Sequence, residues 1–212
     1  MEIKIKNLKK SFKDNIIIDN INISFEEGKT YGIIGRNGSG KSVLLKIICG
    51  FLIPDEGSVE INDIDIYKND CFIPDARALI EKPSFIDELT GLENLEALAF
   101  IQKKVNTKTI LQYVEMVGLT NDIHKKYSTY SLGMKQKLAI VQVIMENPKI
   151  MILDEPFNGL DKKSYQDIIE IFKEIKKKSK IIIIATHIES DISELCDEIY
   201  EIENKTVNYI SK

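Results

Sequence analysis

The residues Gly35-Arg36-Asn37-Gly38-Ser39-Gly40-Lys41-Ser42 decide the fold, because they fit the phosphate-binding pattern G-x-x-x-x-G-K-[ST]. Residues 30–34 before them predict a short buried strand, and the apolar residues between 43 and 48 predict a helix after them. Glycines let successive backbone N–H groups face one concavity, and the helix N-terminus adds positive charge. A simple glycine turn is the alternative interpretation, but this strand–loop–helix context favours phosphate binding. Lys41 should then reach the β- and γ-phosphates of a nucleotide, and Ser42 should ligate Mg²⁺.

A second apolar run ends in two acids. Residues 150–153 predict a buried strand, and Asp154, Glu155 and Pro156 follow it directly. Because open α/β sheets place their sites at the carboxyl ends of strands, we expect both acids beside the glycine-rich loop. Asp154 would hold Mg²⁺, and Glu155 would orient or deprotonate an attacking water. An acidic N-cap for the next helix is the alternative, but Asp161 is better placed for that role.

A histidine follows the next buried run. Residues 181–185 predict another strand, and His187 comes just after its end. An imidazole at this position can bind the γ-phosphate and hold the geometry of the site. Taken alone, His187 would more often be structural, but the neighbouring motifs favour the functional interpretation.

The rest of the chain alternates strands and helices, which predicts an α/β fold with a parallel sheet covered on both faces. The first 35 residues and residues 58–66 read as strands, with a turn at 54–57 between them. Residues 199–202 and 206–210 read as a hairpin. The expected helices cover 90–102, 107–117, 131–147, 162–178 and 191–196.

Composition narrows the classes of protein. The chain has 212 residues, a net charge of -4 and a sequence pI of about 5.4, so no nucleic-acid partner is expected. Cys49, Cys71 and Cys196 are too few and too far apart for a metal or disulfide framework, which favours a reduced, cytosolic protein. The longest apolar runs are too short to cross a bilayer. If the protein works at a membrane, another protein spans it.

Over essentially its whole length the chain resembles the nucleotide-binding domain of ABC transporters. The signature segment, Tyr130-Ser131-Leu132-Gly133-Met134, stands where that family has L-S-G-G-Q, and Asn158-Gly159-Leu160-Asp161 matches its dimer loop. The resemblance implies a P-loop NTPase (RecA-like) core with an N-terminal antiparallel β region and an inserted helical subdomain. The core would comprise residues 1–81 and 136–212, and the helical subdomain about 82–135, within one ABC ATPase domain.

The resemblance also implies cofactors and partners. ATP and Mg²⁺ would bind between two subunits arranged head to tail, the partner being a second copy or a homologous ATPase subunit. Ser131 and Gly133 would contact the partner's ATP, Asp161 would lie in the loop that touches the partner, and Phe12 would stack on adenine. A separate transmembrane permease would complete the transporter, with this chain cytoplasmic and peripheral on the inner face of the cell membrane.

One position departs from the family. Glu81 stands where ABC domains carry a glutamine that senses Mg²⁺ and the permease. A carboxylate binds Mg²⁺ more strongly than an amide and has no N–H donor. Together with the Tyr-Ser-Leu-Gly-Met signature segment, Glu81 resembles the exporters that protect bacteria from bacitracin and lantibiotics.

The resemblance therefore implies an ATPase that powers an exporter of antimicrobial peptide or another small amphiphile. A soluble ABC-type ATPase acting on ribosomes or DNA is the alternative, although such proteins commonly carry a long coiled coil or two such domains. Another P-loop enzyme, such as a kinase, would need neither the signature segment nor His187.

Overall fold

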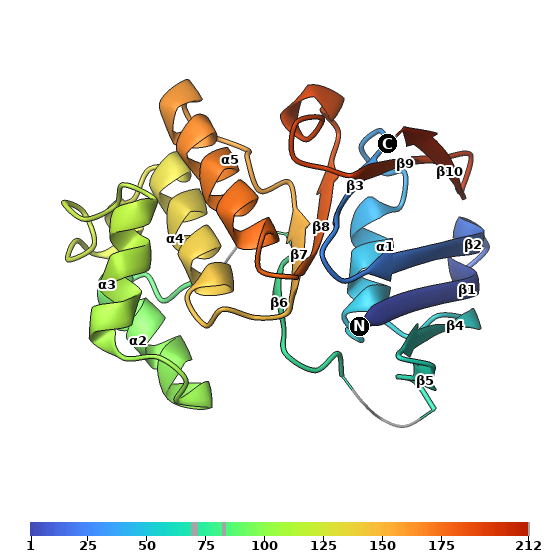
Figure 1. The fold of residues 1–212 in the computed structure, drawn as a ribbon, viewed down its shortest axis with the longest axis horizontal. Coiled ribbons are helices and arrows are strands. Elements are labelled where there is room, and N and C mark those ends of the chain that lie inside the picture. Colours follow the sequence, from blue (N-terminus) through green and yellow to red (C-terminus); the bar gives the residue numbers. More distant parts are fainter. Residues whose placement is uncertain (69–71, 82–83, 212) are drawn as a thin grey trace.

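A six-stranded sheet forms the centre of the molecule, which the computed structural model describes over residues 1–68, 72–81 and 84–211 (Figure 1). Its strands lie in the order β10-β9-β3-β8-β7-β6. In that order they span Thr206–Ser211, Glu198–Glu203, Thr30–Ile34, Ile181–Thr186, Ile150–Asp154 and Ala76–Leu79. Neighbouring strands are parallel except β10 and β9, which form the expected antiparallel hairpin. Cys71 lies outside the described residues.

Helices cover both faces of this sheet, as its fully buried central strands β3, β7 and β8 predicted. Along β8, Ile182 and Ile184 pack with α4 (Leu132–Ile144) and α5 (Lys162–Lys176). Ile181 and Ile183 pack on the opposite side, in a core that includes α1 (Lys41–Ile48). In Figure 1, α1 lies between the central sheet and the N-terminal strands, with α4 and α5 across the sheet from it.

The N-terminal antiparallel region is a four-stranded sheet in the order β2-β1-β4-β5. Its strands are β1 (Glu2–Phe12), β2 (Asn15–Glu26), β4 (Glu56–Ile61) and β5 (Ile64–Asp65). The prediction of one strand over 58–66 is wrong, because Asn62 and Asp63 have φ values of 49° and 65° and turn the chain back as a two-residue hairpin. The turn expected at 54–57 also ends early, since β4 already begins at Glu56.

Three of the expected helices form the part of the molecule shown at the left of Figure 1. They are α2 (Gly91–Gln102), α3 (Thr107–Met116) and α4, with a 3-10 turn at Tyr127–Thr129 before α4. The predicted capping box of α2 is complete. Thr90 Oγ1 accepts a hydrogen bond from the Glu93 N–H at 3.1 Å, and Glu93 Oε2 accepts one from the Thr90 N–H at 2.7 Å.

Two helices end earlier than predicted. Helix α4 stops at Ile144, because Asn147 adopts a φ of 51° and its N–H bonds back to the Ile144 carbonyl. Helix α5 stops at Lys176, and Ser179 has a φ of 53°. In both places a residue with a left-handed φ follows the end of the helix and turns the chain away from the helix axis.

Two other differences concern short segments. The α-helix expected at 191–196 is wrong: a 3-10 turn covers Glu189–Asp191, and the chain then turns so that Ile192 and Cys196 pack over Gly32 of β3. Strand β6 was not predicted. It pairs in parallel with β7 and brings the chain to Glu81.

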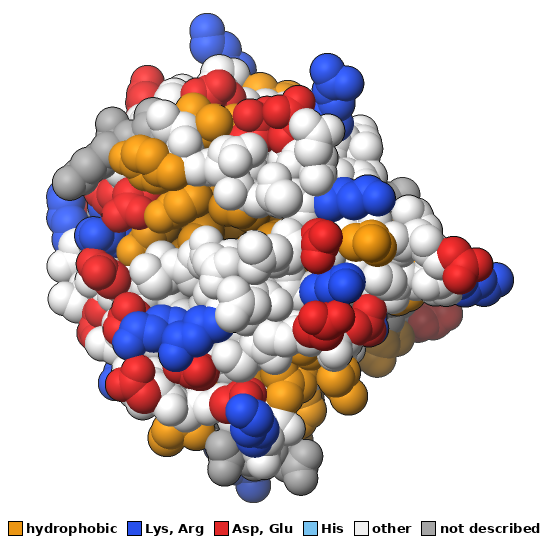
Figure 2. All heavy atoms as spheres, turned by 90° about the vertical axis from the view of Figure 1, so that its right-hand side faces the viewer, with side chains coloured by type: hydrophobic (Ala, Val, Ile, Leu, Met, Phe, Trp, Pro, Cys, Tyr) orange, Lys and Arg blue, Asp and Glu red, His pale blue; other side chains and the backbone are white. Residues whose placement is uncertain are grey.

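The face formed by the N-terminal strands carries acidic and basic side chains close together (Figure 2). Ion pairs account for much of this mixture. Lys4 binds Asp63 at 2.9 Å, and Lys6 binds Glu60 at 2.6 Å. Within the described ranges, every helix is too short or too polar to span a bilayer.

Candidate functional site

The glycine-rich loop joins β3 to α1, as predicted. Gly40 is the N-cap of α1 and has a φ of 107°, a left-handed conformation that suits glycine. A Cβ atom at this position would lie 2.8 Å from the side chain of Ile18 in β2. The loop is thus shaped by glycine at a point where β2 leaves no room for another residue.

Lys41 folds back over this loop. Its ammonium group donates hydrogen bonds to the carbonyl oxygens of Gly35 and Arg36, at 2.7 and 3.2 Å, and its side chain is almost fully buried. The same group lies 4.0 Å from Glu155 Oε1. The positive charge of Lys41 is therefore fixed between the glycine-rich loop and the carboxylate of Glu155.

Ser42 and Asp154 meet beside this lysine. The Ser42 hydroxyl donates to Asp154 Oδ2 at 2.5 Å, which ties the first turn of α1 to the end of β7. Burial raises the pKa of Asp154, although the hydrogen bond from Ser42 opposes this shift, and the negative charge of Glu155 adds to it. A buried carboxylate with a raised pKa is stabilised by a bound cation.

Glu155 is held at both carboxylate oxygens. Thr186, at the end of β8, donates its hydroxyl proton to Oε2 at 3.0 Å, and His187 Nδ1 lies 2.8 Å from Oε1. The structure therefore brings together Glu155 and His187, which the sequence placed at neighbouring strand ends. Thr186 was missed, because a threonine at a strand end carries no motif of its own.

Lys41, Ser42, Asp154 and Glu155 line one hollow of about 340 Å³. Its lining comprises Ile17, Asn37, Gly38, Gly40, Lys41, Ser42, Val43, Glu81, Asp154 and Glu155. Among the described residues there is no group of three Asp, Glu, His or Cys side chains that would cage a metal. Mg²⁺ is usually held by one or two carboxylates together with phosphates and water, so the Ser42 hydroxyl and the Asp154 carboxylate suit it.

The signature segment lies at the start of α4, outside this hollow. Ser131 caps the helix by accepting the Met134 N–H at 3.3 Å, and both Ser131 and Leu132 are exposed. Asp161 caps α5 in the same way, and the N–H of Ser164 is the main cause that lowers its pKa to about 2. Because Ser131 is exposed, the N-terminus of α4 is accessible to an anion.

A family model described as ABC transporter matches residues 18–158. The chain belongs to the ABC transporter family. Its fold agrees with a solved structure titled as the ATP-binding subunit of an ABC transporter, with a TM-score of 0.89, 25% identity, and coverage of 100% of this chain and 90% of that one. ABC transporter ATP-binding domains are ATPases, so this chain is an ATP-hydrolysing subunit.

Three curated relatives are similar to this chain. An uncharacterised ABC transporter ATP-binding protein of Bacillus subtilis (strain 168) is 39% identical, over 92% of this chain and 89% of the relative. A lantibiotic transport ATP-binding protein of Streptococcus pyogenes is 36% identical, over 92% and 84%. A bacitracin transport ATP-binding protein of Enterococcus faecalis is 35% identical, over 93% of this chain, which spans 65% of that longer protein.

Glu81, the predicted departure from the family, is among the residues that line the hollow. Its carboxylate forms an ion pair with Lys46 of α1, which the sequence did not reveal, and its side chain is 65% exposed. The next residues, 82 and 83, lie outside the described ranges. Phe12 ends β1 with its ring exposed, and Ile17 of β2 rather than Phe12 is among the residues that line the hollow.

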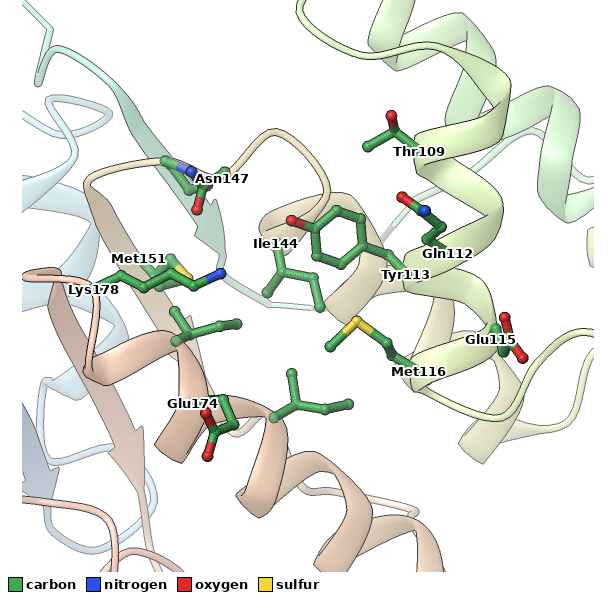
Figure 3. A pocket seen from close by; sticks show the side chains of 13 residues that line it. Thr109, Gln112, Tyr113, Glu115, Met116, Ile144, Asn147, Met151, Glu174 and Lys178 are labelled. Atoms are coloured by element: carbon green, nitrogen blue, oxygen red, sulfur yellow. The ribbon is translucent and has the colours of Figure 1, made fainter.

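Another cleft, of about 430 Å³, opens between α3 and α5 (Figure 3). Tyr113 and Met116 of α3 face Ile144 at its floor, and Glu174 and Lys178 stand at its rim. It contains no glycine-rich loop and no pair of adjacent carboxylates. Its chemistry does not suit a nucleotide.

Replacing the loop lysine tests the phosphate site. We expect Lys41→Ala to lower ATP hydrolysis by at least about a hundredfold, because it removes the positive charge fixed between the loop and Glu155. Release of phosphate from ATP by the purified chain measures this. Lys108→Ala, on the exposed side of α3, is the control and should hydrolyse ATP at the wild-type rate. An active Lys41→Ala variant would contradict the assignment.

The raised pKa of Asp154 predicts a pH effect on stability. Since the folded chain binds this proton more tightly than the unfolded chain, stability is lost as pH rises through the raised pKa. Asp154→Asn keeps an acceptor for Ser42 and cannot ionise. Without nucleotide, we expect the variant to have a higher Tm than wild type at about pH 8 and a similar one at about pH 4, the ordinary carboxyl range. Equal Tm differences at both pH values would show that Asp154 is not shifted.

Proposed function

We propose that this chain powers an exporter of antimicrobial peptide or another small amphiphile, together with a separate membrane permease. The observation that carries the ATPase part is the contact of Glu155 with Thr186, His187 and Lys41 beside the glycine-rich loop. The exporter class rests on the bacitracin and lantibiotic transport proteins among the relatives. The Tyr-Ser-Leu-Gly-Met signature segment and Glu81 support the same subgroup.

The chemistry proposed for the site follows from its contacts. Glu155 would orient or deprotonate the attacking water, with one carboxylate oxygen held by Thr186 and the other by His187. Lys41 and the backbone N–H groups of the loop would bind the phosphates. Mg²⁺ would be bound by Ser42 and Asp154, with Glu81 able to join them only by leaving Lys46.

We infer a head-to-tail dimer because one copy leaves the site half built. Ser131 and Gly133 do not line the hollow beside the loop, yet Ser131 is exposed at the N-terminus of a helix. A second copy, or a homologous ATPase subunit, would place its own signature segment over the ATP held here. The loop that ends at Asp161 would lie in the same interface, and Phe12 would contact adenine.

The proposed location follows from the proposed partner. The helical subdomain, about 82–135, would pass the movement of the dimer to the permease, which holds the substrate pocket. This chain would then sit on the cytoplasmic side of the membrane, bound to the permease at the inner face. The predicted core, residues 1–81 and 136–212, would carry the nucleotide.

The dimer can be trapped. Glu155→Gln keeps the side chain's size and removes its ability to act as a base, so ATP should accumulate in the closed interface and the chain should elute as a dimer. Adding Ser131→Arg should return it to a monomer, because a bulky cation replaces the helix cap at the partner's ATP. Size-exclusion chromatography with light scattering, with and without ATP, measures both. A wild-type monomer that hydrolyses ATP at the full rate at all protein concentrations would contradict the head-to-tail dimer.

The partner can be captured directly. We expect affinity purification of the tagged chain from detergent-solubilised native membranes to recover a multi-span protein in about equal amount, identified by mass spectrometry. Lys41→Ala is a matched control and should recover the same membrane protein, because the proposed permease contact lies on the helical subdomain and not on the glycine-rich loop. Recovery of ribosomal or DNA-bound proteins instead would favour a soluble ABC ATPase.

A further inference from the structure

A buried glutamine connects α4 to the segment that carries Glu155. Gln136 lies in the second turn of α4 and is 8% exposed. Its Nε2 donates to the carbonyl oxygen of Pro156 at 2.8 Å, and the carbonyl of Glu155 lies 3.4 Å from the same nitrogen. The amide thus holds the main chain at the position where β7 ends and the loop toward α5 begins.

The first turn of α4 touches the same loop again. A Cβ atom at Gly133 would lie 2.9 Å from the carbonyl oxygen of Gly159, so the two backbones are in close contact. A Cβ atom at Gly159 would in turn lie 2.6 Å from the side chain of Leu132. With Gln136, these contacts attach the start of α4, the signature helix, to both ends of the segment 155–159.

The backbone of Glu155 needs such support. Its φ of 49° is a left-handed conformation that costs a non-glycine residue free energy unless its surroundings hold it. Its N–H is fixed by the Ala185 carbonyl at 2.8 Å, in the sheet. The next residue, Pro156, has no N–H to donate. A neighbouring side chain can therefore fix the main chain there only through the carbonyl oxygens of Glu155 and Pro156.

We propose that Gln136 is a positioning residue that links the signature helix to the glutamate of its own subunit. This rests on the proposed dimer, in which Ser131 contacts the partner's ATP while Glu155 acts on the ATP of its own glycine-rich loop. Engagement of the partner's ATP at the start of α4 would then be transmitted through the Gln136 amide to Glu155. The two ATP sites of the dimer are coupled by a hydrogen bond within each subunit.

The variant Gln136→Met tests this link, because it preserves side-chain length and removes the N–H donor. We expect single-turnover hydrolysis to slow by about tenfold, the effect of one lost hydrogen bond of ordinary strength. KM for ATP should stay the same, since the glycine-rich loop is untouched. The Hill coefficient for ATP should fall toward one, because the sites lose their connection.

A matched control separates positioning from stability. Val141→Ala creates a small cavity in the same helix, where Val141 is fully buried, and leaves the Gln136 amide in place. It should lower Tm without changing the Hill coefficient. Gln136→Leu is the second variant, in case Gln136→Met folds poorly: its apolar side chain also lacks a donor, so the loss should be about as large.

The outcomes distinguish this proposal from the proposed dimer. A wild-type turnover rate and Hill coefficient in both Gln136 variants would overturn the link. The link would also be overturned if Gln136→Met lost no more activity than Val141→Ala does for an equal decrease in Tm. ATP-dependent dimerisation should survive when Gln136→Met is added to Glu155→Gln. If Glu155→Gln alone stays monomeric, the dimer fails, whereas the single-turnover rate of Gln136→Met still reports on the positioning of Glu155.

Discussion

Strand β8 lies between β3 and β7 and pairs in parallel with both, and every part of the proposed ATP site depends on that register. Ile34 lies opposite Thr186, and Asp154 lies opposite Ala185. The glycine-rich loop, the two acids and the Thr186–His187 pair therefore leave the sheet at one edge. A shift of β8 by one residue would turn Thr186 to the other face of the sheet and away from the Glu155 carboxylate that it contacts.

The sequence predicted this arrangement well because its signals are local. An apolar run that is followed by a glycine-rich loop, by two acids or by a histidine shows where a strand stops. Parallel pairing of these strands then places their ends at the same edge of the sheet. It missed Gln136 and Thr186, whose partners lie 19 or more residues away and are set by the packing of α4 and β8. It missed β6 as well, since Ala76–Leu79 is short and includes Arg77, which pairs with Glu146 beside α4.

The errors in element boundaries share a cause. Asn62, Asp63, Asn147 and Ser179 all adopt left-handed φ values within or next to the segments whose ends were misplaced. Periodicity reports which residues face a core, but it does not report the backbone conformation that ends an element. Asn and Asp tolerate this conformation better than most residues, so these three positions carried a weak signal, whereas Ser179 carried none.

The charges that line the hollow beside the glycine-rich loop limit what it can bind. Asp154 and Glu155 are adjacent acids near one buried lysine, and the pKa of Asp154 is raised by burial. Phosphates would add negative charge to this hollow, so nucleotide binding requires more positive charge than Lys41 supplies, which is the physical reason to expect Mg²⁺ with ATP. Glu81 increases that requirement relative to a glutamine, unless it keeps its ion pair with Lys46. The Lys46–Glu81 pair therefore opposes the capture of metal by Glu81, and the family's glutamine, being neutral, would form no such pair.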